Sequence, residues 1–132
     1  MKTRQVITLD DAKRVAAAAQ TEANRNQWDV VIAIVDEGGN LKYFQREEAL
    51  IGSIEVAIAK AKAALLFKRP TKVWEDKVVD GHSGCLSLPG VVAIEGGVPL
   101  IVGDEIVGAI GVSGVKSCED GQIAAAGAKA LG

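Results

Sequence analysis

Apolar residues near the N-terminus recur every three or four positions, the spacing that places them on one face of a helix. Most of them are alanine, so the buried stripe of this helix is expected to be narrow. Thr8 followed by Asp11 is a capping-box pattern, in which a hydroxyl and a carboxylate satisfy free backbone N–H groups at a helix start. The pattern predicts a helix over residues 9–25.

A β-branched apolar run follows at residues 30–35, and a second strand-like run occupies residues 41–45. Between them, Gly38 and Gly39 can supply the positive φ that a tight turn requires, so the segment predicts a β-hairpin. The first of the two strands is apolar at every position. We therefore expect it in the middle of a sheet, covered on both faces.

Helical spacing returns over residues 53–68, and Pro70 ends this second helix because proline lacks a backbone N–H. Thr71 can cap a shorter third helix that reaches residue 79. Residues 80–90 contain glycine, serine and proline and are predicted to form a loop.

Strand-like spacing begins again after this loop and continues almost to the C-terminal helix. Gly96 and Gly97 separate the first pair of strands, and Gly103-Asp104, a type II′ hairpin dipeptide, separates the second pair. The predicted strands are residues 91–95, 98–102 and 105–112.

A final helix is expected to start at Ser117, which forms a capping pattern with Asp120, and to reach residue 131. The order of elements is then helix, two strands, two helices, three strands and helix. Hairpin-linked strands imply an antiparallel sheet of about five strands with helices on at least one face. The sequence thus predicts one α/β (α+β) domain over residues 1–132.

Composition narrows the classes of function. The 132 residues are 48% hydrophobic and 24% charged, the balance of a globular domain. A net charge of −2 and 4% aromatic residues disfavour nucleic acid as a partner. No apolar run has the length of a signal peptide core or a membrane span, and Cys85 and Cys118 suit neither a disulfide framework nor a metal pattern. We expect a cytoplasmic protein with both thiols reduced and no membrane partner.

The Gly-rich second half is the part of the chain best suited to shape a ligand site. Glycine inside a strand costs about 0.5–1 kcal/mol relative to alanine, so Gly96 and Gly97, which follow Glu95, need a compensating reason. Tight packing of a helix on the sheet and close approach of a ligand to the backbone explain them equally well.

The exit of the last strand brings Ser113, Gly114 and Lys116 to the start of the final helix. Free N–H groups and the positive end of the helix dipole favour an anion there, and Lys116 adds a positive charge. The spacing matches neither a dinucleotide fingerprint nor a P-loop, so a small carboxylate suits this exit better than a nucleotide. An ordinary capped helix start is the alternative.

His82 is the only histidine, which excludes a metal site built from several histidines, and we expect no bound metal ion. In its loop it can serve as an axial ligand to haem iron or as a lone acid or base, or it can lie exposed without a role. Glu95, His82 and Ser113 could converge as acid, base and donor in an enzyme acting on a small hydroxy- or oxo-acid.

Lys60 lies among alanines at the border of the apolar face of the second helix. A lysine at such an edge ordinarily extends its ammonium group to water, and a functional role would require burial. Glu119 and Asp120 are explained by helix capping and by compensation of the helix dipole.

Several segments of the chain resemble the GlcG/HbpS family, and together they cover nearly its whole length. They are the alanine-rich run around Lys60, Pro70-Thr71, Gly96-Gly97-Val98-Pro99, and the run Gly-Ala-Ile-Gly-Val-Ser-Gly that ends at Gly114. The resemblance implies a profilin-like sandwich around a five-stranded antiparallel sheet. It also implies homo-oligomers, from dimers to octamers.

The same resemblance implies an accessory protein that binds haem or a small organic acid. Some members of the family bind haem, in secreted sensory proteins and in domains attached to PduO-type corrinoid adenosyltransferases, and others are encoded beside glycolate, glycerol or propanediol catabolism. Here Glu95 precedes only two glycines where the family usually has three, and the first helix has no histidine, which leaves His82 as the candidate iron ligand. An enzyme of small-acid metabolism and a structural assembly module remain the alternatives.

Overall fold

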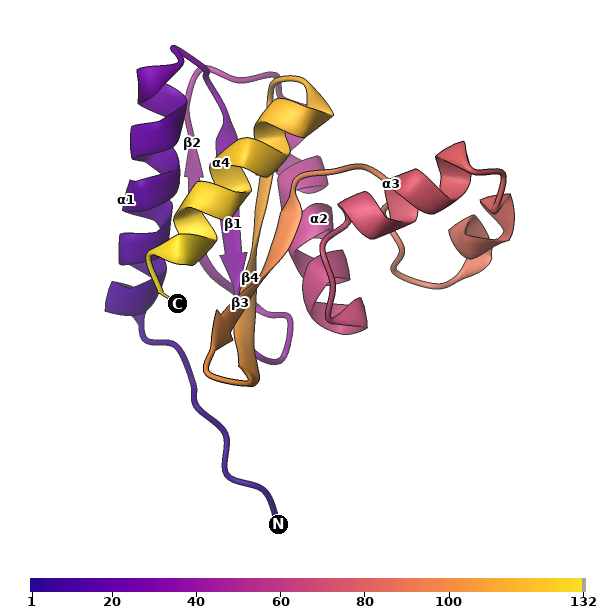
Figure 1. The fold of residues 1–132 in the computed structure, drawn as a ribbon. Helices are drawn as coiled ribbons and strands as arrows, with labels where there is room; N and C mark the ends of the chain where they lie inside the picture. The colour runs from indigo at the N-terminus through magenta and orange to yellow at the C-terminus, as the bar shows by residue number, and fades with distance from the viewer. Residues whose placement is uncertain (132) are drawn as a thin grey trace.

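The computed structural model describes residues 1–131. Its centre is a four-stranded antiparallel sheet in the order β2-β1-β4-β3, with helices on both faces (Figure 1). The elements in chain order are α1 (Leu9–Arg25), β1 (Val31–Val35), β2 (Leu41–Arg46), α2 (Ser53–Phe67), α3 (Lys72–Val79), the 3-10 helix η1 (Ser83–Ser87), β3 (Gly97–Val102), β4 (Glu105–Ser113) and α4 (Ser117–Lys129).

The sheet separates two apolar cores, one on each face. α1 and α4 cover one face, where Ile32, Ile34 and Ile110 are fully buried, and α2 covers the other, where Val31 and Ala33 are fully buried. Because alternate residues of a strand point to opposite faces, β1 is buried at every position, as expected of a strand inside the sheet. The helix-flanked antiparallel sheet confirms the predicted α/β sandwich.

Local sequence patterns explain how the helical layers begin and pack. The Thr8 hydroxyl accepts a hydrogen bond from the Asp11 N–H at 3.1 Å, and the Asp11 carboxylate accepts one from the Thr8 N–H at 2.9 Å, which confirms the first capping box. On the opposite face, a Cβ at Gly111 of β4 would overlap the carbonyl of Ala57 and the amide of Ala61 in α2. Packing of α2 on the sheet therefore accounts for this glycine.

Residues 91–95 form no strand, so the sheet has four strands rather than about five. Pairing with β4 begins at Gly97, and Gly96 just before it has φ of +136°, a value that favours glycine. The Glu95 N–H donates to the Glu75 carboxylate of α3 at 3.0 Å instead of to a neighbouring strand. This tertiary contact overrides the strand-like spacing of the segment.

Two predicted helix caps are also wrong. Thr71 occupies the N-cap position of α3, but its hydroxyl accepts a hydrogen bond from the Gly97 N–H at 2.9 Å and does not cap the helix. α4 starts with Ser117 as its first helical residue, so Lys116 is the N-cap. The Thr71 hydroxyl is used by the first residue of β3 instead of by α3. A pattern within the helix cannot reveal this contact, because Gly97 lies far away in the sequence.

The segment of residues 72–90, which contains α3 and η1, projects from the body of the molecule and is called the arm below (Figure 1). The predicted loop of residues 80–90 lies in it, with η1 as its regular part. Within residues 1–131, no helix is both long and apolar enough to cross a membrane.

Candidate functional site

A lysine is buried between α2 and the sheet. Lys60 is only 1% exposed, and its ammonium group donates to the Val112 carbonyl at 3.0 Å and to the Asp120 carboxylate at 3.1 Å. The expectation that Lys60 extends to water is wrong, because the side of α2 that carries it packs against β3 and β4 rather than facing solvent. An ammonium group in this position needs a partner, and the Lys60–Asp120 pair supplies it.

Asp120 brings the opposite charge from the first turn of α4. It is 2% exposed, and its second carboxylate oxygen accepts a hydrogen bond from the Val115 N–H at 3.1 Å. Burial raises the pKa of the Asp120 carboxyl, while the Lys60 ammonium and the Val115 N–H oppose that rise. Asp120 therefore joins α4 to α2 across the sheet, which is more than the capping role predicted for it.

Two glycines make room for this pair. A Cβ at Gly96 would lie 2.7 Å from the Lys60 ammonium nitrogen, so a side chain there would displace the lysine. At Gly97 a Cβ would overlap the Lys60 backbone carbonyl. Of the two explanations for these glycines, the structure supplies the packing one, because Lys60 of α2, the Val112 carbonyl of β4 and Thr71 approach them closely.

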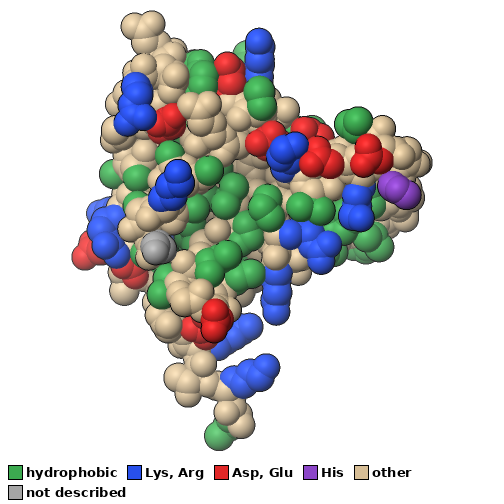
Figure 2. All heavy atoms as spheres, in the orientation of Figure 1, with side chains coloured by type: hydrophobic (Ala, Val, Ile, Leu, Met, Phe, Trp, Pro, Cys, Tyr) green, Lys and Arg blue, Asp and Glu red, His purple; other side chains and the backbone are tan. Residues whose placement is uncertain are grey.

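Glu95 lies half-buried between this pair and the arm. Its carboxylate rests against Gly121 of α4, where a Cβ would overlap it. Burial is the largest cause that raises the pKa of the Glu95 carboxyl; Glu75 and Asp76 add repulsion, and Lys72 opposes the rise. Figure 2 shows acidic side chains gathered around a basic one where the arm meets the body.

The structure brings most of the predicted ligand residues together. Glu95, Gly96 and Gly97 lie beside the Lys60–Asp120 pair, and Ser113 and Gly114 follow Val112 at the end of β4. At the exit of β4, the carboxylates of Glu119 and Asp120 already occupy the place predicted for an anionic ligand.

At the exit, the Lys116 N–H donates to the Glu119 carboxylate at 3.2 Å, as the capping explanation of Glu119 expects. The Val115 N–H is used by Asp120, and the Lys116 side chain is exposed. Two N–H groups of the predicted carboxylate site are therefore occupied by side chains of the protein.

His82 is not part of this cluster. It is exposed on the arm just before η1, and the histidine in Figure 2 lies at the outer end of the arm. Ser113 is buried at the end of β4. The structure therefore does not assemble Glu95, His82 and Ser113 into the acid, base and donor of a reaction centre. Among residues 1–131, no group of three or more His, Cys, Asp or Glu side chains could hold a metal ion.

Sequence reasoning missed the burial of Lys60. The signal in the sequence was weak: Lys60 is flanked by alanines of the apolar face, and two unexplained glycines occur later in the chain. One sequence cannot show that Gly96 lies against Lys60, because the two are brought together only when α2 packs on the sheet.

The chain is similar in sequence to known proteins. The family model described as haem degrading protein HbpS-like matches residues 7–129. Protein GlcG of Escherichia coli (strain K12) is 37% identical over 114 residues, which cover 86% of this chain and 85% of GlcG.

Two solved structures extend the similarity to the fold. A double mutant of Streptomyces reticuli HbpS superposes with a TM-score of 0.89 at 30% identity, covering 100% of this chain and 91% of that one. The PduOC:heme complex superposes with a TM-score of 0.87 at 30% identity, covering 96% of each chain. On sequence and fold together, the chain belongs to the HbpS-like family.

Proposed function

We propose that this protein is a small accessory protein that binds haem, with the His82 imidazole as the iron ligand. The PduOC relative has been crystallised with haem, and the family carries the description of a haem degrading protein. The observation in this chain that carries the proposal is the arm, which presents its imidazole to solvent among exposed apolar side chains.

The residues of the arm suit haem chemically. Within residues 1–131 the His82 ring makes no hydrogen bond, so its nitrogens are open to an external partner. Val79 is 78% exposed, Leu86 57% and Leu88 45%, so the arm carries three exposed apolar side chains within six positions of the histidine in the sequence. Histidine is a common axial ligand of haem iron, and apolar side chains provide the face against which a porphyrin packs. Bound haem would supply a redox-active iron whose potential the axial ligand and its surroundings set.

Titration with hemin tests this proposal. The wild-type protein is expected to give a saturable Soret band, and His82→Ala is expected to lose the spectrum of a histidine-ligated iron. Cys85→Ser and Cys118→Ser are matched controls, because they remove the other soft donors of the arm and of α4 while leaving the imidazole in place. An unchanged spectrum in His82→Ala would show that the imidazole does not hold the iron.

We also propose that the chain forms homo-oligomers, as its family resemblance implies. Leu50, Ile51 and Val56 line an open apolar hollow at the start of α2 and are exposed in the single chain, which supports a contact with a further copy. Native mass spectrometry of protein taken from cells would report the number of copies and any retained haem together. A monomer without ligand at micromolar concentration would contradict both expectations.

We propose a metabolic pathway and a cellular location for this function as well. The resemblance to proteins of glycolate, glycerol or propanediol catabolism supports a cytoplasmic accessory role beside the breakdown of small alcohols and acids. A catalytic role in the same metabolism is less well supported, because Glu95 and His82 lie in different parts of the molecule.

A further inference from the structure

A second candidate site lies away from the arm, where the N-terminal segment passes the end of α2 and the turn between β3 and β4. Two adjoining pockets of about 310 and 210 Å³ share Arg4, Lys68 and Ile106 in their walls. Together they are called the N-terminal cleft here. The rest of its lining is Lys2, Thr3, Glu37, Gly38, Leu65, Leu66, Asp104 and Glu105.

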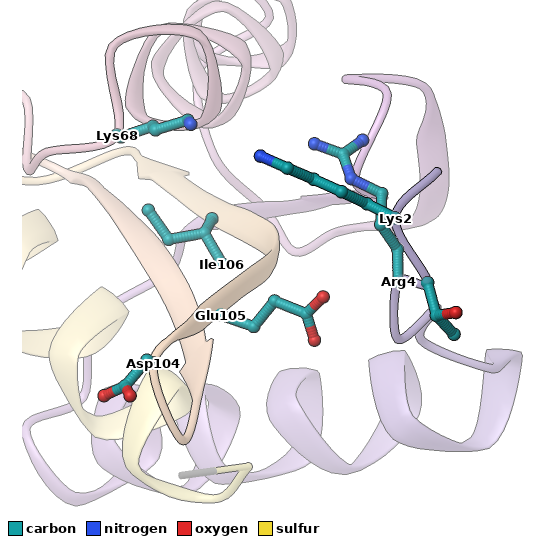
Figure 3. Close-up of a pocket in the computed structure, with 7 residues that line it drawn as sticks. Lys2, Arg4, Lys68, Asp104, Glu105 and Ile106 are labelled. Carbon is teal, nitrogen blue, oxygen red and sulfur yellow. The ribbon is translucent and has the colours of Figure 1, made fainter.

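Three cations converge on this cleft. Figure 3 shows the charged ends of Lys2, Arg4 and Lys68 directed into one space between α2 and the β3–β4 hairpin. None of the three forms an ion pair within residues 1–131. Like charges that face one space repel one another, and an anion between them would be attracted to all three, although the carboxylates of Glu37, Asp104 and Glu105 also line the cleft.

Two of these cations, whose side chains are exposed, lie next to distinctive backbone features. Lys68 ends α2 with φ of 55°, a left-handed conformation that costs energy in a residue other than glycine. The Gln5 N–H, next to Arg4, donates to both oxygens of the Glu105 carboxylate at 3.4 Å. Glu105 is thereby engaged with the N-terminal segment.

The cleft also contains an acceptor that lacks a donor. Glu37 lies in the turn between β1 and β2, and its Oε2 atom is shielded from solvent yet has no hydrogen-bond partner within residues 1–131. A buried acceptor left without a donor is destabilising, and such atoms in native proteins require an explanation. Glu37 also lines the cleft, so its carboxylate is placed to accept a hydrogen bond from a ligand hydroxyl there.

From these contacts we infer that the N-terminal cleft binds a small hydroxylated organic anion. Its carboxylate or phosphate group faces Lys2, Arg4 and Lys68, and one of its hydroxyl groups donates to the Glu37 carboxylate. The larger pocket, at about 310 Å³, lies at the lower end of the range of about 300–1,000 Å³ found for small-molecule sites, so the cleft has room for a small ligand. This site shares no lining residue with the arm and does not depend on haem binding.

Four probes separate the two recognition elements. Glycerate carries both a carboxylate and hydroxyl groups, glycerol 3-phosphate replaces the carboxylate with a phosphate, propionate lacks the hydroxyl groups, and glycerol lacks the anion. Calorimetric titration of the full chain is expected to show saturable binding of glycerate or glycerol 3-phosphate, whichever anion the cleft prefers. Propionate is expected to bind more weakly, and glycerol is expected not to bind.

Variants then assign the binding to the cleft. Arg4→Ala and Lys68→Ala are each expected to weaken binding of the preferred anion at least about tenfold, because each removes a charge-assisted hydrogen bond. Glu37→Leu is expected to weaken glycerate binding but leave propionate binding unchanged. Lys62→Ala removes an exposed lysine of α2 outside the cleft and is expected to bind like the wild type.

Amide chemical-shift mapping with the same probes fixes the location without relying on variants. The expected shifts fall at residues 2–5, 37–38, 65–68 and 104–106. The proposal is overturned if no probe binds at millimolar concentration, if the shifts cluster elsewhere, or if Lys62→Ala weakens binding as much as Lys68→Ala does.

Discussion

Removal of one member of the Lys60–Asp120 pair is expected to destabilise the fold severely. In Asp120→Ala the Lys60 ammonium keeps only the Val112 carbonyl as a partner, at a site where its side chain is 2% exposed. Breaking a buried pair from one side costs about 3–5 kcal/mol, because it leaves an uncompensated charge out of water. A domain of this size has a free energy of unfolding of only about 5–15 kcal/mol, so the loss is a large fraction of the total.

The expected loss is readily measured by thermal and urea denaturation, followed by circular dichroism. At about 4 °C per kcal/mol for a domain of this length, Asp120→Ala should lower Tm by about 12–20 °C. Lys60→Met retains most of the buried stem and is expected to be destabilised as well, since Asp120 then lacks its ammonium partner. The double variant should lose less than the sum of the two single losses, by about 1–3 kcal/mol.

A surface ion pair in the same protein provides the control. Lys72 and Asp76 are 2.9 Å apart on α3, but their side chains are 52% and 56% exposed, so Lys72→Ala should cost less than about 1 kcal/mol. The reasoning is refuted if Asp120→Ala and Lys72→Ala have equal, small effects, because the Lys60–Asp120 pair would then behave as if solvated.

Three further predictions follow from individual contacts. Gly111→Ala should destabilise the protein by about 1–3 kcal/mol in urea denaturation, because the added methyl group overlaps the backbone of α2 at Ala57; a neutral effect would show that the helix can shift freely. Thr8→Ala should cost about 1 kcal/mol through loss of the capping hydrogen bond to Asp11, and a cost below the error of the measurement would count against a structural role for the cap. Because folding raises the pKa of Glu95 above its ordinary value of 4.5, its contribution to stability is present at low pH and is lost as the pH rises through that range. Wild type should therefore lose stability relative to Glu95→Gln between pH 4 and pH 7, whereas a constant difference would contradict the assigned environment.

The first half of the fold could be predicted because its signals are local. The helix Leu9–Arg25 was predicted with the observed bounds, since the Thr8–Asp11 capping box and the spacing of its alanines lie within the helix itself. The same holds for β1, whose uninterrupted apolar run placed it inside the sheet. Antiparallel pairing of β3 with β4 brings two of the predicted ligand segments to the same end of the sheet: Gly97 pairs with Gly111, and the Val112 N–H donates to the Gly96 carbonyl at 2.9 Å. Their role in binding a ligand stays a prediction.

The sequence by itself thus determined the class of fold, the family and the helices and strands whose patterns repeat within one element. Only the tertiary structure decided that residues 91–95 leave the sheet, that Lys60 is buried against Asp120 and that His82 lies far out on the arm. The physical reason for the first two is that they depend on which polar group finds a partner far away in the chain, and the third depends on how the arm projects from the body. The Gly-rich segment that follows Glu95 is an example. Gly96 and Gly97 leave room for Lys60, which lies some 36 positions earlier in the chain.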